Sequence, residues 1–147
     1  PALMDGENII ARNAEIGGNE YSMTCVSVGN PHCVIFVDNV DKVDIEKTGP
    51  QIENAEIFPE RINTEFVRVV NRRTLKMRVG ERGNGETLAC GTGACAAAVA
   101  AVLEGKCDKG KDITVKLRGG DLIVNYTDEK ITLTGDCNLV FTGEIEY

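Results

Sequence analysis

The residues most suited to chemistry are a cysteine and the glycines around it. Cys90 follows a glycine-punctuated loop and precedes a stretch without charge, Gly91–Leu103, whose composition predicts a helix. The first backbone N–H groups of a helix have no partner within it, and the positive end of the helix dipole lies there. A cysteine at that point is favoured as a thiolate, and the same N–H groups can hold a carboxylate. Cys90 is therefore the leading candidate for a catalytic residue.

The size and charge of the chain narrow the classes of partner. A chain of 147 residues fits one domain that buries its own core. Its net charge of -7 and its 5% aromatic residues argue against a surface built for nucleic acid or anionic membrane, and favour a small polar substrate. No apolar run approaches the roughly 20 residues that cross a bilayer, and no signal peptide opens the chain. These features predict a soluble, cytoplasmic protein.

Metal and disulfide chemistry are not favoured. The chain has six cysteines without a C-x-x-C pair, and His32 is its only histidine. Zinc sites usually need paired Cys or His ligands at short spacing, so we predict no metal site. A chain with this apolar content does not need disulfides to fold. No lysine stands in a phosphate-binding context, which argues against pyridoxal phosphate, and we predict no cofactor.

The rest of the chain reads mainly as short strands. Residues 1–22 have weak periodicity and predict an irregular arm with one strand at most, and residues 29–32 predict a loop. Residues 43–54 have helical spacing that Gly49 and Pro50 interrupt, which predicts two short helices rather than one. Strands are predicted at residues 23–28, 33–38, 65–71, 74–79, 113–117, 122–126, 130–134 and 138–145.

These elements predict a single α+β domain over residues 1–147. About eight strands with turns every 8 to 12 residues are typical of a closed or strongly curved, mostly antiparallel sheet. Only one long helix is available to fill such a barrel-like sheet. Because Gly91–Leu103 is apolar on all sides and built from small residues, we expect strands to wrap around most of it.

Four blocks give a specific resemblance. Residues 29–32 read Gly-Asn-Pro-His, residues 58–63 Phe-Pro-Glu-Arg-Ile-Asn, residues 81–83 Glu-Arg-Gly and residues 89–93 Ala-Cys-Gly-Thr-Gly. In order and spacing they resemble the C-terminal half of the diaminopimelate epimerases, cofactor-independent isomerases of lysine and peptidoglycan precursor synthesis. The resemblance implies two similar lobes, each a curved sheet around a helix, with the active site between them. The N-terminal lobe, with a second catalytic cysteine, is then a missing partner of this chain.

The physical reason for two cysteines is independent of that resemblance. Inverting a stereocentre removes a proton from one face of the α-carbon and returns one to the other face, so two acid/base groups must flank the substrate. One helix start supplies only one of them. We therefore expect the isolated chain to be inactive, and its exposed cleft face to favour association into a homodimer.

The resemblance also implies roles for individual residues. Cys90 would be the acid/base of this lobe, and the N–H groups of Gly91 and Thr92 would hold the substrate α-carboxylate. His32 and Glu81 would lie beside the reacting centre, with Glu81 also contacting substrate. The residues expected at the distal amino and carboxylate groups of diaminopimelate are Asn30, Asn63 and Arg82.

Each role has a structural alternative that the residues leave open. Cys90 could be a packed residue at the start of a buried helix, and Asn30 and Asn63 could be turn residues. His32 could be a core histidine, and Glu81 with Arg82 a solvated ion pair. Two other functions also remain. Related racemases act on proline, hydroxyproline or histidine, and a domain of the same fold could bind a partner without catalysis.

Overall fold

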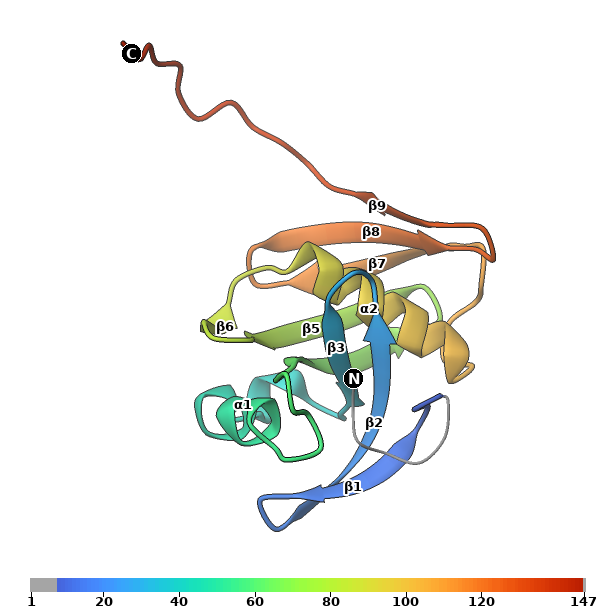
Figure 1. The fold of residues 1–147 in the computed structure, drawn as a ribbon. Coiled ribbons are helices and arrows are strands. Elements are labelled where there is room, and N and C mark those ends of the chain that lie inside the picture. The colour runs from blue at the N-terminus through green and yellow to red at the C-terminus, as the bar shows by residue number, and fades with distance from the viewer. Residues whose placement is uncertain (1–7, 147) are drawn as a thin grey trace.

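The computed structural model describes residues 8–146, which form one sheet and the helices packed on it (Figure 1). In these residues the sheet has nine strands in the order β1-β2-β3-β4-β5-β7-β8-β9, with β6 attached to β5. The strands are β1 (Arg12–Ile16), β2 (Asn19–Ser27), β3 (Pro31–Phe36), β4 (Asn63–Asn71), β5 (Thr74–Glu81), β6 (Gly85–Thr87), β7 (Asp112–Leu117), β8 (Gly120–Tyr126) and β9 (Ile131–Thr134). The predicted α+β fold with a curved sheet is confirmed, and the sheet stays open because β1 and β9 are its edges.

Two strand pairings determine where the helices lie. The pairs β3–β4 and β5–β7 are parallel, and the other pairings are antiparallel. Parallel neighbours need a crossover connection, because a tight turn reverses the direction of the chain. The first crossover carries helix α1 (Ile45–Glu53), preceded by the 3-10 turn η1 (Val40–Lys42), and the second carries helix α2 (Gly91–Leu103).

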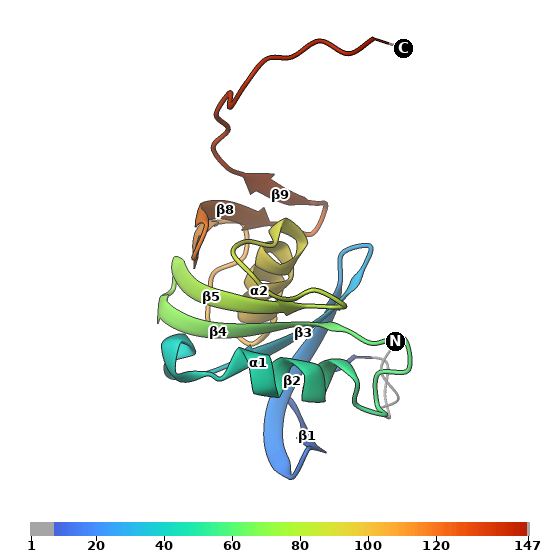
Figure 2. The same ribbon diagram turned by 90° about the vertical axis from the view of Figure 1, so that its left-hand side faces the viewer.

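Helix α2 runs through the middle of the domain, as its composition predicted. It contacts β2, β3, β4, β5, β7, β8 and β9, and Figure 2 shows it between β8 and β9 on one side and β4 and β5 on the other. Ala94, Ala97 and Ala101 are fully buried, and their side chains are short enough to let the strands approach the helix backbone. The curved sheet therefore fixes the position of the first turn of α2, where Cys90 lies.

Helix α1 packs on the other side of β4 and β5 and corrects one prediction. Residues 45–53 form one helix with Pro50 inside it, where two short helices were expected. A proline inside a helix costs about 3 kcal/mol. Ile45 and Ile52 are buried near the two ends of the helix, and burying each contributes about 1.5–3 kcal/mol. The N-cap Asp44, which accepts a hydrogen bond from the Lys47 N–H, adds to this.

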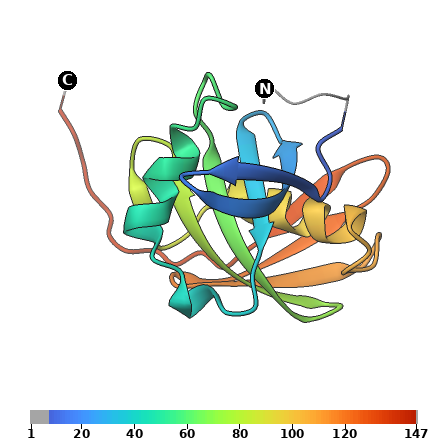
Figure 3. The ribbon, with the colours of Figure 1, turned by 90° about the horizontal axis from the view of Figure 1, so that it is seen from below.

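The two ends of the described chain also differ from expectation. β1 falls within the predicted irregular arm, but β2 begins at Asn19, four residues earlier than predicted, and residues 1–7 lie outside the described part. Gly17 and Gly18 join these strands with φ values of 58° and 77°, which favour glycine. Figure 3 shows the β1–β2 ribbon crossing the domain, seen from below.

The predicted strand at residues 138–145 is wrong. The chain after β9 forms no strand in the described residues and extends away from the sheet (Figure 1). Its pattern of apolar residues suits a strand, but the segment leaves the sheet after β9 and pairs with neither edge strand. Four large side chains consequently remain 77–88% exposed, those of Leu139, Val140, Phe141 and Ile145.

Candidate active site

Cys90 is the N-cap of α2 and is half-buried. Its extended backbone (φ -139°, ψ 111°) ends the preceding loop, and its carbonyl oxygen accepts the Ala94 N–H at 2.9 Å to begin the helix. Its sulfur accepts the Gly93 N–H at 3.3 Å and lies 3.6 Å from Thr92 Oγ1. The hydrogen bonds of the described residues leave the N–H groups of Gly91 and Thr92 open, as expected for the first turn of a helix.

The thiol of Cys90 does not have the lowered pKa that its position predicted. Burial raises the pKa of the half-buried Cys90 thiol, and Glu81 and Glu65 act in the same direction when they are ionised. The hydrogen bonds from Thr92 and Gly93 lower the pKa, but by less. Desolvation disfavours the thiolate more than the helix start favours it, so Cys90 is a protonated thiol at neutral pH.

Behind this turn, His32 and Glu65 form a buried pair. His32 Nδ1 lies 2.7 Å from Glu65 Oε1, and neither side chain is exposed to solvent. Burial raises the pKa of Glu65, while its contact with His32 opposes the shift. The strand β3 begins at Pro31, so His32 belongs to a strand and not to the predicted loop. A core histidine with both nitrogens engaged is out of direct reach of a substrate.

Asn30 connects that pair to the helix. Its Oδ1 lies 3.0 Å from His32 Nε2, and its Nδ2 donates to Thr92 Oγ1 at 3.3 Å. The residue lies in the β2–β3 loop, and the parallel pairing of β3 with β4 places this loop beside the start of β4. Asn30, His32, Thr92 and Cys90 are therefore joined by contacts between side chains, as their predicted common site requires.

Asn63 and Arg82 form a second group at the same end of the sheet. Asn63 Nδ2 donates to the Pro31 carbonyl at 2.8 Å, and its Oδ1 accepts the Arg82 N–H at 3.0 Å. The exposed Arg82 guanidinium donates to the Glu60 carbonyl at 2.9 Å. Asn63 is thus a buried amide that begins β4 and joins the start of β3 to the end of β5, and it is not the turn asparagine of the structural alternative.

Glu81 completes the set of predicted residues. It is half-buried at the end of β5, and its Oε1 accepts a hydrogen bond of 2.6 Å from Thr87 Oγ1. Its charge raises the pKa of both Cys90 and Glu65, so the Glu81 carboxylate faces the same site. Glu65 and Thr87 are the two members that the motifs did not indicate. The only signal for Glu65 was the polar run at residues 63–65, which opens an otherwise apolar strand.

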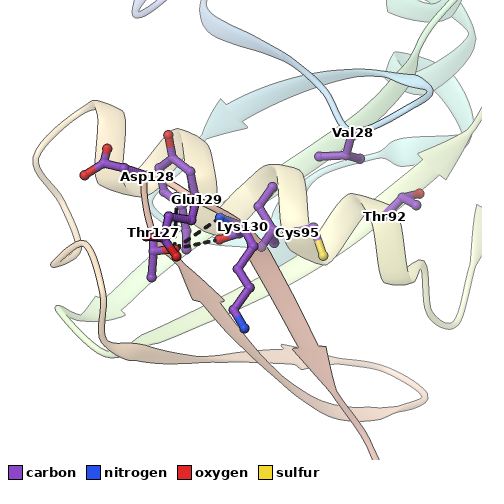
Figure 4. A pocket seen from close by; sticks show the side chains of 9 residues that line it. Val28, Thr92, Cys95, Thr127, Asp128, Glu129 and Lys130 are labelled. Carbon is purple, nitrogen blue, oxygen red and sulfur yellow. Dashed lines mark hydrogen bonds between the residues drawn. The ribbon is translucent and has the colours of Figure 1, made fainter.

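A pocket of about 460 Å³ lies next to this end of α2 (Figure 4). Thr92 and Cys95 line one side, and residues 126–131 of the β8–β9 turn line the other. Cys90 is not among its lining residues, so the pocket adjoins the site without containing the candidate sulfur.

Within residues 8–146, no three His, Cys, Asp or Glu side chains gather as a metal site requires. No helix in that range is long and apolar enough to cross a membrane.

Comparison with known proteins identifies the family of this domain. A family model described as diaminopimelate epimerase matches residues 24–140, a range that includes every predicted site residue. The chain belongs to the diaminopimelate epimerase family. The family assignment confirms the resemblance that the four sequence blocks indicated.

Individual diaminopimelate epimerases are similar over nearly the whole chain. The protein of Acetivibrio thermocellus is 51% identical over 99% of this chain and 52% of its own length. That of Bacillus cytotoxicus is 48% identical over 100% of this chain and 52% of its own length. That of Nostoc punctiforme is 50% identical over 95% of this chain and 50% of its own length. The chain therefore spans about half the length of the curated relatives it matches.

Solved structures at lower sequence identity resemble the fold of this chain. A phenazine biosynthesis protein of the PhzF family from Enterococcus faecalis has a TM-score of 0.51 at 19% identity, covering 70% of this chain and 36% of its own. The PhzF-family protein of Bacillus anthracis has a TM-score of 0.50 at 18% identity, covering 71% and 34%. At these identities the likeness shows the fold alone.

Proposed function

We propose that this chain supplies one catalytic half of a diaminopimelate epimerase, which interconverts the LL and meso forms of 2,6-diaminopimelate. The observation that carries the proposal is the placement of the Cys90 sulfur beside the open N–H groups of Gly91 and Thr92. A carboxylate bound to those N–H groups would bring the α-carbon next to the sulfur. Proton transfer at that carbon is the chemistry that such an arrangement allows.

Cys90 would serve as acid in one direction and as base in the other. In one direction Cys90 acts as the acid and donates its S–H proton to one face of the α-carbon, in keeping with a pKa that burial raises. A base must remove the α-proton from the opposite face in the same reaction. The charge of the intermediate carbanion spreads onto the carboxylate, which the N–H groups at the start of α2 would stabilise. In the reverse reaction Cys90 is the base.

The other predicted residues divide into contacts and supports. We assign Asn30, Glu81 and Arg82 to substrate contacts, because they lie at the accessible end of the site, and a guanidinium fork suits a distal carboxylate. Asn63 keeps a second amide hydrogen for a ligand while holding the backbone that carries Arg82. His32 is buried against Glu65, so its proposed role is to hold Asn30 rather than to contact the substrate.

A partner with the second cysteine follows from the same chemistry. One lobe places one acid/base group on one face, and inversion needs two. The exposed apolar side chains of Leu139, Val140 and Phe141 give such a partner a surface to cover. We propose that this partner is an N-terminal lobe like the other half of the relatives, and that the assembly works in the cytoplasm.

Reconstitution tests the proposal. The N-terminal half of the Acetivibrio thermocellus relative would be joined to this chain, its association checked by mass, and α-proton exchange measured in deuterated water. We expect exchange with diaminopimelate only when both halves are present, and loss of inversion in Cys90→Ala. Cys95→Ala, one turn further along the same helix, is the matched control and should remain within about twofold of the unsubstituted chain because it leaves the helix start intact.

The alternatives predict different results from the same assay. Exchange with proline, hydroxyproline or histidine, and none with diaminopimelate, would favour a related racemase. An associated pair that exchanges none of these amino acids would favour a domain that binds without catalysis. Inversion that survives Cys90→Ala would contradict the proposed role of this residue in either enzyme.

A further inference from the structure

Glu65 is a buried carboxyl group that the proposed reaction does not use directly. Its side chain is fully buried in β4, one of its oxygens lies 2.7 Å from His32 Nδ1, and the other, Oε2, has no hydrogen-bond partner among the described residues. A buried carboxylate with an unpartnered oxygen is costly, whereas a neutral carboxylic acid needs a partner mainly for its one O–H donor. Its protonation state therefore depends on its neighbours.

The contacts of Asn30 determine where protons lie in this group. Asn30 donates its amide N–H to Thr92 Oγ1, so its Oδ1 is the atom that faces His32 Nε2. An amide oxygen only accepts, which requires a hydrogen on Nε2. One further proton is then shared between His32 Nδ1 and Glu65 Oε1, at 2.7 Å.

Burial favours the protonated form of Glu65. Desolvation raises the pKa of Glu65, and its unpartnered oxygen also disfavours the ionised form. A protonated carboxyl at Glu65 donates to His32 Nδ1. Every donor then points the same way, toward α2. Thr92 Oγ1 accepts from Asn30 and is left to donate its own hydrogen to the Cys90 sulfur, 3.6 Å away.

We propose that Glu65 is a positioning residue that sets the reactivity of the Cys90 sulfur through a directed chain of hydrogen bonds. The members of the chain, from donor to final acceptor, are Glu65, His32, Asn30, Thr92 and Cys90. The inference deepens the proposed function, because it concerns the same sulfur. It requires neither a substrate nor the second lobe.

Glu81 acts on both ends of the hydrogen-bond chain, Glu65 and Cys90. Cys90 faces Glu81 from β5 and Glu65 from β4, and both carboxylates raise the pKa of its thiol when they are ionised. Glu65 faces Glu81 and the thiols of Cys25 and Cys33. Keeping Glu65 neutral therefore removes one of the two negative charges that oppose a thiolate at Cys90.

Alkylation of Cys90 tests the chain directly. The rate of reaction with iodoacetamide would be followed from pH 6 to 10 by peptide mass spectrometry, with Cys95 and Cys107 as internal references. Glu65→Leu removes the donor, and we expect Cys90 alkylation at neutral pH to slow about tenfold, equivalent to one unit of thiol pKa. Glu65→Gln keeps an N–H donor to His32 and should stay within about twofold of the unsubstituted chain.

A double substitution tests whether Glu65 and Thr92 act on Cys90 through one hydrogen-bond chain. Thr92→Val removes the last hydroxyl on an exposed residue and should slow alkylation by itself. With Thr92→Val already present, Glu65→Leu should add nothing, because residues acting through one network are not additive. Should Glu65→Leu fail to fold, infrared spectra of the unsubstituted chain must still show a protonated carboxyl band at neutral pH that Glu65→Gln lacks.

Three results would overturn the inference. Cys90 alkylation unchanged in Glu65→Leu would remove the link, and additive effects with Thr92→Val would mean separate causes. Faster alkylation in Glu65→Leu would mean that the chain runs in the opposite direction and holds the thiol form. None of these readouts requires epimerase activity, so a failed reconstitution and a failed chain remain distinguishable.

Discussion

Replacing Gly93 with alanine should destabilise the protein, because the added methyl group would overlap with buried atoms of the candidate site. A Cβ added to Gly93 would lie 2.8 Å from Glu65 Oε1 and 3.1 Å from Cys90 Sγ. Real Cβ atoms do not approach a neighbour as closely as the first of these distances, so one group has to move. Glu65 is fully buried and held by His32, and Cys90 is part of the helix start, which leaves no inexpensive way to relieve the contact.

The size of the effect follows from three contributions. Overpacking a buried site costs about 1–3 kcal/mol. Alanine is better than glycine inside a helix by at most about 1 kcal/mol, which offsets part of that cost. Displacing Glu65 from His32 adds about 1–3 kcal/mol for a disrupted buried hydrogen bond. We expect Gly93→Ala to lose about 2–3 kcal/mol of unfolding free energy, or about 1 M in the urea midpoint at a slope of about 2 kcal/mol per M.

Gly91→Ala is the matched control for stability. It lies in the same turn, but the added Cβ would meet only Leu133 Cδ2, at 3.2 Å. This methyl group is the end of a side chain that is 42% exposed, so it can rotate away. We expect Gly91→Ala to change the unfolding free energy by about 0.5 kcal/mol or less, as is usual for surface substitutions. Equal urea midpoints for the two variants would show that Gly93 is not required for close packing against Glu65.

Three further predictions concern charged and thiol groups away from α2. Arg78→Met should lower the unfolding free energy by about 3 kcal/mol in urea titrations, because the 9% exposed Arg78 donates to both oxygens of Glu86 and to the Val40 and Val43 carbonyls. Glu86 keeps only its contact with Arg118, at 3.0 Å. Arg78 holds the pKa of Glu86 below its usual range, so the ion pair contributes fully above the unfolded carboxyl pKa of about 4.3 and is lost as pH falls through the lower folded value. The difference in unfolding free energy between the unsubstituted chain and Glu86→Gln should therefore shrink as pH falls below about 4.3, and a difference that does not change with pH there would contradict this. A hydrogen bond from Cys33 lowers the pKa of Cys25, so Cys33→Ala should slow alkylation of Cys25 at neutral pH severalfold, as measured by peptide mass spectrometry.

The sequence predicted the central helix well, because composition determines burial at that point. A helix without charge on any face has no side to present to water, and alanines at every turn leave room for surrounding strands. The glycine-flanked position of Cys90 likewise predicted the helix start. Both features depend on residues close together in the chain, which is why they could be predicted without coordinates.

Features that depend on distant contacts were not predictable in the same way. Glu65 and His32 are 33 residues apart and meet only because β3 and β4 pair in parallel. The pKa of Cys90 was predicted in the wrong direction because the local rule describes the helix start and not the desolvation that the surrounding sheet imposes. Pro50 was expected to divide a helix that two buried isoleucines hold together. Residues 138–145 have the pattern of a strand, but strand formation needs pairing with another strand, and these residues pair with none in the described chain.

The raised pKa of Cys90 has a consequence for the proposed reaction. A carboxylate bound at the start of α2 brings another negative charge close to the sulfur, which favours the thiol still more. In the proposed reaction Cys90 would therefore act as the acid once the carboxylate is bound, and a base on the opposite face would take the α-proton. In the return direction the same transition state is reached with the proton on the other sulfur, so Cys90 must then be the thiolate. The Gly93 N–H, and Thr92 Oγ1 in the proposed hydrogen-bond chain, would stabilise that thiolate at the half-buried sulfur.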